Sequence, residues 1–175
     1  MNDTVTIGTI ATPLGTMWAA ISDRGLGYLG FGEQSRALAA AWARRWVPEA
    51  QLVPDGPELL DLAAQFEAYF AGQLREWSFP LDLRGTPFQL RAWEGLRQIP
   101  YGQVRAYSEH AVAIGHPHAV RAVGAANGAN PISILVPCHR LVGKSGSLVK
   151  YGGGLEIKRR LLELEGAHAI ADCRL

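Results

Sequence analysis

The residues best suited to chemistry in this sequence are Cys138 and His139, which follow Pro137 at the end of an apolar run. A free thiol has a pKa of about 8.5, so only a small fraction is the nucleophilic thiolate at pH 7. A neighbouring imidazole that is held by an acid can take the thiol proton and make the sulfur nucleophilic. A lone Cys-His pair is more often structural than catalytic, so the residues around it must decide between the two roles.

The two cysteines, Cys138 and Cys173, are too few for a zinc site when no cluster of histidines stands at ligand spacing. We therefore expect no metal, and no residue pattern indicates a cofactor. Cys173 lies in a short polar tail, so a reduced intracellular pair is favoured over a disulfide. No signal peptide is visible, and no apolar stretch approaches the ~20 residues that span a membrane. These features predict a cytoplasmic protein.

The net charge of +1 hides a difference between the two halves of the chain. Residues 1–85 carry 6 basic and 10 acidic side chains, whereas residues 86–175 carry 11 basic and 6 acidic ones. A basic half on a nearly neutral protein indicates contact with a polyanion, although an ordinary solvated surface explains the charge equally well.

Apolar periodicity divides the first half of the chain into short strands and helices. Alternating patterns and glycine-bounded apolar runs predict strands, whereas helical composition before a proline, or apolar spacings of three and four, predicts helices. The expected strands are Thr4–Ala11, Met17–Ser22 and Gly25–Phe31, with Trp77–Leu83 as a further candidate. The expected helices are Ala37–Trp46 and Pro57–Phe70. With 48% hydrophobic residues, the chain can build a real core.

A domain boundary is expected at Arg84-Gly85. Thr86 is a favourable helix N-cap, and Pro87 suits the first helical position. The expected helix is Phe88–Gln98, with Phe88 on its apolar side. Everything after it is expected to be helix or loop, up to a last helix at Leu155–Glu165.

Two short helices in the second half form a candidate helix-turn-helix. The first, Ser108–Ile114, has Ser108 as its expected N-cap, and the second is His118–Asn127. The second helix is nearly all small residues and carries Arg121 as its one arginine. Such a helix suits a close, sequence-blind approach to a narrow groove. A tightly packed internal helix that Arg121 caps is an equally good interpretation of these residues.

These elements together predict two domains. Residues 1–84 are expected to form an α/β N-terminal domain with a small antiparallel sheet. Residues 86–170 are expected to form a mostly α-helical C-terminal domain that contains the candidate helix-turn-helix, Cys138 and His139. Residues 171–175 are expected to form a tail.

The context of Cys138 is extensive and resembles a known family. Pro137-Cys138-His139-Arg140, with Asn130-Pro131 before it and Tyr151-Gly152-Gly153-Gly154 after it, is similar to the O6-alkylguanine-DNA alkyltransferases. Further matching motifs are Thr86–Gln89, Ile99–Val104, Arg121–Gly124, Ala126–Gly128, Leu155–Lys158 and Leu161–Gly166. The resemblance runs nearly unbroken from residue 86 to 166 and is much weaker in the N-terminal half, beyond Ala11–Gly15 and Tyr69–Gly72.

The resemblance implies DNA repair by direct, irreversible transfer of an alkyl group from O6 of guanine in DNA to Cys138, with each molecule acting once. His139 would act as a base through an intervening water, with Glu165 orienting and charging the imidazole. Asn130 would hold the turn that joins the DNA-binding helices to the site. Tyr151 would give its hydroxyl proton to N3 of the guanine, which is first flipped out of the base stack at a cost of a few kcal/mol.

The resemblance also implies that residues 86–170 are the catalytic and DNA-binding domain, and it implies where DNA and the flipped base are held. Tyr107 would press on the phosphate beside the lesion, and Arg121 would fill the gap in the base stack. The residues expected at the minor-groove contact are Tyr107, Arg121, Ala122 and Gly128. The residues expected around the base pocket are Ser133, Leu141, Lys150 and Gly152, with the Gly152 N–H facing O6. The expected partner is double-stranded DNA containing O6-alkylguanine, bound by a monomer, with cooperativity along the DNA left open.

The sequence departs from the family pattern at a few positions. Ala129 stands where a longer polar or basic residue is frequent, Lys150 where a small residue is common, and Gly152 where serine or alanine is usual. His110 stands where leucine is expected, and we interpret it as a core or surface residue without a chemical role.

Two other classes of function compete with alkyl transfer. A lesion-binding protein without chemistry would lack the acceptor cysteine, yet Cys138 is present. A cysteine hydrolase would need an oxyanion site and turnover, and no further motif for one is visible. Counting product molecules per protein molecule separates the hydrolase and the binding protein from alkyl transfer.

Overall fold

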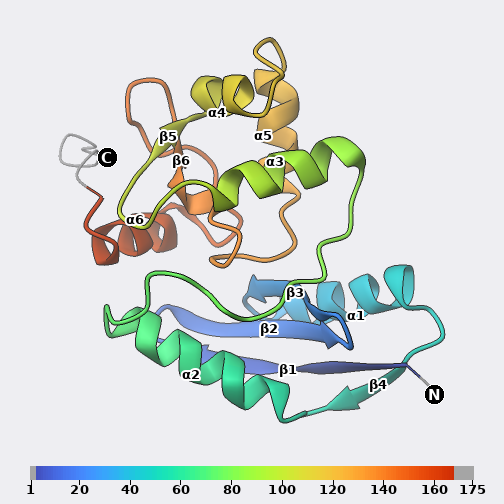
Figure 1. Cartoon of the computed structure of the whole chain (residues 1–175). Coiled ribbons are helices and arrows are strands. Elements are labelled where there is room, and N and C mark those ends of the chain that lie inside the picture. The colour runs from blue at the N-terminus through green and yellow to red at the C-terminus, as the bar shows by residue number, and fades with distance from the viewer. Residues whose placement is uncertain (1–2, 168–175) are drawn as a thin grey trace. The chain divides into compact units, whose positions relative to one another are not determined.

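The computed structural model describes residues 3–167, and the chain divides into two compact units, Met1–Arg84 and Gly85–Leu175 (Figure 1). The tail expected at 171–175, the end of the domain expected at 86–170, and Cys173 lie outside the described residues. Within the described part of the chain, no helix has both the length and the apolar character needed to cross a membrane.

The N-terminal unit is built around a four-stranded sheet with the strand order β3-β2-β1-β4. Its strands are β1 (Thr4–Thr12), β2 (Gly15–Ser22), β3 (Gly25–Phe31) and β4 (Gln51–Pro54). The first three pair antiparallel as predicted, whereas β4, which the periodicity does not predict, lies parallel to β1. The sheet is therefore mixed. With only four residues, β4 is too short for an alternating pattern to be recognised.

Two helices cover this sheet, and both were expected: α1 (Gln34–Trp46) and α2 (Glu58–Phe70). Successive side chains of a strand point to opposite faces of a sheet. In β1, Val5 belongs to a buried cluster with Trp42 of α1, whereas Gly8, on the other face, lies against Leu59 of α2. The two helices therefore pack on opposite faces of the sheet, and Figure 1 shows them so.

The segment Trp77–Leu83 is not the strand that its alternation predicts. It makes one isolated bridge, between Leu81 and Leu26, and Trp77 packs against the rings of Phe66 and Tyr69. The buried Asp82 carboxylate accepts hydrogen bonds from Arg84 Nε at 2.9 Å and from Arg84 Nη2 at 2.8 Å. A charged group that must be paired inside the unit thus fixes this segment in place of a strand ladder.

The described part of the C-terminal unit is mostly helical, but it is not helix and loop alone. Its helices are α3 (Pro87–Arg97), α4 (Tyr107–Ala113), α5 (Val120–Gly128), the short 3-10 helix η1 (Cys138–Arg140) and α6 (Leu155–Leu164). Two short strands, β5 (Arg105–Ala106) and β6 (Leu141–Val142), pair in parallel. This pair corrects the prediction, and it holds the start of α4 beside the segment that follows η1.

The starts of α3 and α4 test two capping predictions. Thr86 caps α3 as predicted, because Gln89 N donates to Thr86 Oγ1 at 3.2 Å and Thr86 N donates to Gln89 Oε1 at 2.9 Å. The prediction that Ser108 caps α4 is wrong, because Ser108 lies inside that helix. The Glu109 carboxylate instead accepts the Ala106 N–H at 2.8 Å and satisfies a free donor at the helix start.

Helix α3 supports the end of α5. Trp93 is buried, and its indole N–H donates to the carbonyl of Ala126 at 2.8 Å. Ala126 stands in the last turn of α5, directly before the chain turns toward η1. The bond therefore fixes the point from which the cysteine-bearing loop departs.

Candidate active site

Cys138 begins η1, at the end of a largely buried loop that leaves α5. Asn130 stabilises this loop through two side-chain hydrogen bonds. Its Nδ2 donates to the carbonyl of Val136 at 2.8 Å, and its Oδ1 accepts the N–H of Ile132 at 3.0 Å. Both contacts are to backbone groups, which is the kind of contact expected of Asn130, and they fix the path of the chain before the thiol.

Two tight turns shape the same loop. The first turn surrounds Ile134, whose φ is 74°. Across it, the N–H of Leu135 donates to the carbonyl of Ser133 at 3.0 Å. A β-branched residue rarely adopts a positive φ, so this turn is strained. A second turn of the same size surrounds Pro137, where the N–H of Cys138 donates to the carbonyl of Val136 at 2.8 Å. The thiol is thus delivered by a rigid backbone.

The Cys138 side chain is buried, with 6% of the residue exposed, and is not in a disulfide. Burial raises the pKa of the thiol because the thiolate loses its solvation. The Asn130 side chain and the Lys158 ammonium act in the opposite direction without cancelling this effect. The resting thiol is therefore protonated at neutral pH, and it needs a base before it can react.

His139 is fully buried and supplies a base. Its Nε2 lies 2.8 Å from Glu165 Oε1. Burial lowers the pKa of the imidazole by more than Glu165 raises it, so the ring is neutral at pH 7. A neutral ring beside a carboxylate carries its proton on Nε2, which leaves a lone pair on Nδ1. Among the described residues, that buried Nδ1 has no hydrogen-bond partner.

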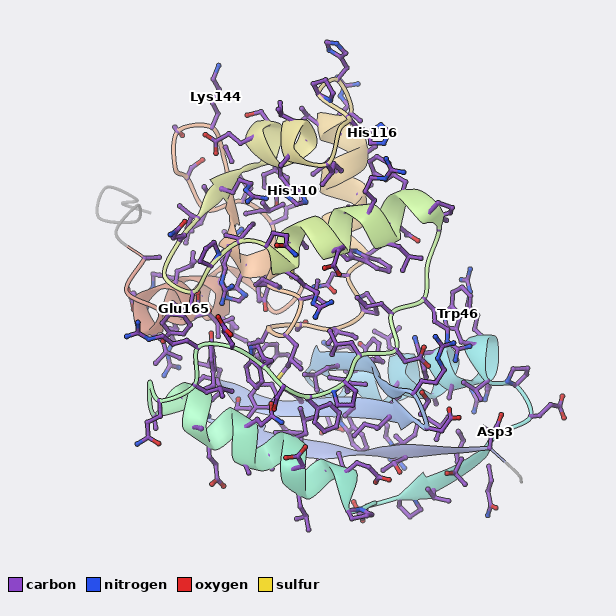
Figure 2. All side chains as sticks on the ribbon, viewed as in Figure 1. Asp3, Trp46, His110, His116, Lys144 and Glu165 are labelled. Carbon is purple, nitrogen blue, oxygen red and sulfur yellow. The ribbon has the colours of Figure 1, made fainter. Side chains whose placement is uncertain are left out.

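Glu165 follows α6 and is buried (Figure 2). Arg140 donates to it twice, from Nε to Oε2 at 2.8 Å and from Nη2 to Oε1 at 3.0 Å. Burial raises the pKa of the Glu165 carboxyl, but His139 and Arg140 outweigh burial and hold that pKa well below its usual range. The carboxylate therefore stays charged and can stabilise an imidazolium at His139.

Two buried cations beside Cys138, Arg140 and Lys158, have no role in the sequence-based prediction. Lys158 is fully buried, and its Nζ donates to the carbonyls of Leu141 at 2.5 Å and Val149 at 2.9 Å. Burial lowers the pKa of Lys158 to about 8, while the charge of Cys138 acts to raise it. The sequence signal that could have found Arg140 is a cation within an apolar stretch, and for Lys158 it is a cation spaced three and four residues from Leu161 and Leu162, on the buried face of a helix.

The hydroxyl of Tyr151 is buried and makes no hydrogen bond within the described part of the chain. Burial raises the pKa of Tyr151 well above its ordinary value, and the charge of Cys138 raises it further. The Ser133 side chain acts in the opposite direction and lowers the pKa, without cancelling the rise. Tyr151 is therefore a protonated donor at every physiological pH. Of the residues expected around the base, Ser133 is half-buried and Leu141 buried, whereas Lys150 and Gly152 are exposed.

Helix α5 presents a smooth, exposed face. Arg121, Ala122 and Gly128, three of the residues expected at the DNA contact, are all exposed. The opposite side of the helix is buried through Val123 and Ala126. The interpretation of α5 as a wholly internal helix capped by Arg121 is therefore wrong, and the helix carries one cation on a surface of small side chains.

Tyr107, the fourth residue expected at the DNA contact, begins α4 and is half-buried. Its hydroxyl oxygen accepts a hydrogen bond from Asn127 Nδ2 at 3.1 Å. Burial raises the pKa of Tyr107, and the charge of Cys138 raises it further. Asn127, which is also buried, has no role in the sequence-based prediction.

His110 is a core residue rather than a surface one, with 1% of it exposed. Figure 2 labels it in the C-terminal unit. Its Nε2 lies 3.0 Å from the carbonyl of Ala92, and its Nδ1 lies 3.3 Å from Arg105 Nη1. Burial lowers the pKa of His110, so the ring is neutral and joins α4 to α3. Within residues 3–167, its hydrogen bonds go to Ala92 and Arg105 and not to the residues around Cys138.

Known protein families match both parts of the chain. Residues 5–83 match the 6-O-methylguanine DNA methyltransferase ribonuclease-like domain, and residues 87–167 match the DNA-binding domain of the same family. The methylated-DNA–protein-cysteine methyltransferase of Mycobacterium tuberculosis strain H37Rv is 56% identical over 122 residues, which are 70% of this chain and 74% of that protein. The inducible protein of the same name from Bacillus subtilis is 45% identical over 142 residues, 81% of this chain and 79% of that protein.

Solved structures give the same result. The crystal structure of Mycobacterium tuberculosis OGT in complex with DNA matches with 46% identity and a TM-score of 0.80, covering 95% of this chain and 96% of that chain. The O6-methylguanine-DNA methyltransferase of Pyrococcus kodakaraensis strain KOD1 matches with 27% identity and a TM-score of 0.63, covering 93% and 99%. The chain therefore belongs to the 6-O-methylguanine DNA methyltransferase family.

Proposed function

We propose that this protein repairs DNA by transferring an alkyl group from O6 of guanine to the Sγ atom of Cys138, once per molecule. The observation that carries the proposal is the buried sequence of contacts around the thiol. Cys138 directly precedes a neutral His139 whose Nδ1 is unpaired among the described residues and whose Nε2 lies 2.8 Å from Glu165. This arrangement can remove a proton from a thiol that burial keeps protonated.

The first step of the reaction activates the sulfur. The Cys138 proton passes to His139 Nδ1 through an intervening water, and the imidazolium that forms is stabilised by Glu165. Arg140 keeps Glu165 ionised and fixed in orientation, while Asn130 holds the loop that presents the thiol. The thiolate then attacks the alkyl carbon, so an S–C bond forms as the bond from that carbon to O6 breaks. The electron pair of the broken bond remains on the guanine.

The second requirement is to neutralise the departing guanine. Tyr151 donates its hydroxyl proton toward N3, where negative charge would otherwise develop. The backbone N–H of Gly152 faces O6, and the carbonyls of Cys138 and Leu141 accept from the exocyclic amine of the base. Ser133 and Lys150 border the same pocket. The high pKa of Tyr151 supports this role, because it keeps the hydroxyl protonated and able to donate when the guanine enters the site.

Helix α5 delivers the damaged guanine by entering the minor groove. Ala122 and Gly128 allow close approach of the helix, and Arg121 occupies the gap that the flipped base leaves. Tyr107, at the start of α4, contacts the phosphate beside the lesion. A surface with small side chains and a single arginine reads no base sequence, as repair of a lesion at any position in the genome requires.

The product and the setting of the reaction follow from the chemistry of sulfur. A thioether does not hydrolyse under mild conditions, and nothing in the proposed mechanism releases the alkyl group, so each molecule is consumed. A reactive thiol also requires a reducing compartment, which favours the cytoplasm. We infer that the protein acts there as a monomer on double-stranded DNA and without a cofactor.

Mass spectrometry tests the proposal directly. After incubation with duplex DNA containing O6-methylguanine, the peptide bearing Cys138 should gain one methyl group for each guanine repaired. Cys138→Ala should abolish transfer while duplex binding persists, and Cys173→Ala serves as the matched control that should keep full transfer. Repaired DNA beside an unmodified Cys138 peptide would refute the mechanism.

A further inference from the structure

Unpaired buried polar atoms in the C-terminal unit mark one residue that the mechanism does not use. In the part of this unit that the structure describes, three such side-chain atoms have no hydrogen-bond partner: His139 Nδ1, Tyr151 Oη and Asn127 Oδ1. Burying a polar group without a partner is unfavourable, so each such group calls for an explanation, and a role in function is one. His139 and Tyr151 have roles in the reaction proposed above. Asn127 has none.

Asn127 is positioned to control a second hydroxyl, that of Tyr107. It stands in the last turn of α5 with 7% of the residue exposed, and its Nδ2 donates to Tyr107 Oη at 3.1 Å. Tyr107 stands at the first position of α4, so the bond links α4 to α5. The charge of Cys138 also acts on the Tyr107 hydroxyl. The pair therefore joins the first turn of α4 to the last turn of α5.

The direction of this hydrogen bond fixes what Tyr107 can do. A tyrosine hydroxyl has one proton and can also accept. Because Asn127 donates to the oxygen, the Tyr107 proton cannot point at Nδ2 and must be offered to another acceptor. A phosphate oxygen is a strong acceptor, and a hydrogen bond to a charged group contributes more than one between neutral groups.

We propose that Asn127 is a positioning residue that directs the Tyr107 hydroxyl proton toward a phosphate oxygen of the DNA strand carrying the damaged guanine. The inference rests on the proposed function, because it takes Tyr107 to contact the phosphate beside the lesion. Asn127 itself touches neither the alkyl group nor the sulfur. It acts on repair of duplex DNA and leaves the chemistry at Cys138 unchanged.

Asn127→Asp reverses the hydrogen bond with almost no change in shape. A carboxylate can only accept, so it draws the Tyr107 proton inward and away from the phosphate. We expect single-turnover transfer from O6-methylguanine in duplex DNA to fall about tenfold or more beyond any charge effect. With the free base O6-benzylguanine, which has no phosphate, the rate should stay within about twofold of the parent protein.

A double-mutant comparison with Tyr107 separates the loss of hydroxyl orientation from the effect of the added negative charge. Asn127→Asp is therefore also made in a Tyr107→Phe background, where no hydroxyl proton remains to be directed. There it should cost only the residual repulsion from DNA, which weakens as salt concentration rises. Ala125→Asp places a carboxylate on the exposed side of the same helix and is the matched control. Its cost should be equal in the two backgrounds.

Asn127→Leu guards against failure of the buried carboxylate variant to fold. It removes the amide donor without adding charge, so the hydroxyl loses its fixed direction. We expect a smaller loss of duplex repair, about threefold, that disappears in the Tyr107→Phe background. Circular dichroism and the transfer rate with the free base show in each case that the domain is intact.

Three outcomes would overturn the proposal. Equal fold losses for Asn127→Asp with and without the Tyr107 hydroxyl would show that Asn127 does not act through Tyr107. Equal losses on duplex DNA and on the free base would show that Asn127 supports the Cys138 site in general. An unchanged duplex rate would show that Tyr107 already donates to position 127. Failure of the proposed function is distinct, because the parent protein would then leave Cys138 unmodified in every assay.

Discussion

At the residue scale, burial sets the chemistry of the site. The same removal of water that keeps the Cys138 thiol protonated also keeps His139 neutral, so the acid and its base begin in matched, uncharged states. Transfer of one proton creates two charges in a low-dielectric interior. The charges already present there, on Glu165, Arg140 and Lys158, determine whether that step is feasible.

Glu165→Gln tests the arrangement around the imidazole. The substitution leaves Arg140 buried without its carboxylate, so we expect unfolding to become easier by about 3–5 kcal/mol in urea titrations. Without a carboxylate to stabilise the imidazolium, single-turnover transfer should slow by about 100-fold or more. Glu163→Gln removes an exposed carboxylate two residues earlier and should change stability by less than about 1 kcal/mol. Equal effects of the two variants would remove the proposed role of Glu165.

Tyr151→Phe tests proton donation to the departing base. The hydroxyl has no partner among the described residues before a guanine binds, so its removal should cost little stability. The rate of transfer should fall about 10-fold to 100-fold, whereas the Kd for duplex DNA should change by less than about threefold. Rapid-quench kinetics and fluorescence titration measure the two quantities. A weakened Kd with an unchanged rate would place Tyr151 in DNA binding alone.

At the element scale, local patterns predict most of the secondary structure and fail where a few residues decide. Strand β1 follows an alternating pattern, β2 and β3 are short apolar runs bounded by turn residues, and Thr86 caps α3 as its spacing with Gln89 predicts. The four-residue β4 and the paired β5 and β6 are too short to carry a period. Trp77–Leu83 alternates like a strand, yet the need to pair the buried Asp82 overrides that pattern.

The candidate site likewise has residues that the sequence identifies and contacts that it does not predict. The thiol, its histidine and the acid stand in a matched motif and could be named from the sequence. The supporting contacts of Arg140, Lys158 and Asn127 depend on segments that are distant along the chain, such as Ile99 O for Arg140 Nη1 at 2.6 Å. No periodicity records such contacts, because they arise only when separate elements pack together.

The loop before the thiol stores backbone strain, and Ile134→Gly should release it. Ile134 has a φ of 74° and is buried, and Ile132, equally buried, provides the matched control. Each substitution to glycine removes a similar apolar side chain, but only Ile134→Gly relieves a positive φ. We expect it to destabilise the protein by about 1–2 kcal/mol less than Ile132→Gly in urea unfolding. A larger loss at Ile134 would mean that its side-chain packing outweighs the strain.

Helix α5 should act on duplex DNA and not on the chemistry. Arg121→Ala removes the side chain that we propose to fill the vacated stack, so repair of O6-methylguanine in a duplex should weaken by about 10-fold or more. Transfer from the free modified base should change little, because no base stack has to be opened. Single-turnover assays on both substrates measure this ratio. Equal losses on both substrates would remove Arg121 from base flipping.

At the scale of the whole molecule, charged groups in both units tie stability to pH. The folded-state pKa of Glu165 lies below its ordinary value of 4.5, and that of Asp82 lies below its ordinary value of 3.8. A carboxyl whose pKa is lowered on folding contributes stability above its ordinary pKa and loses it as pH falls. His110 and His139 have pKa values lowered from 6.5, so their contributions are complete above pH 6.5 and decline below it. Acid unfolding should therefore begin with the histidines and steepen once the carboxyls protonate.

His110→Leu isolates the histidine part of this dependence. An imidazole that stays neutral when folded and becomes charged when unfolded lowers the free energy of unfolding by up to about 1.4 kcal/mol per pH unit below pH 6.5. Leucine cannot titrate, so the variant should show a shallower fall between pH 6.5 and 4.5 in urea titrations made at each pH. Transfer at pH 7.5 should match the parent, because His110 binds Ala92 and Arg105 and no group of the reaction. An unchanged slope would mean that His110 also titrates near 6.5 in the folded protein, so that its burial carries no linkage to acid stability.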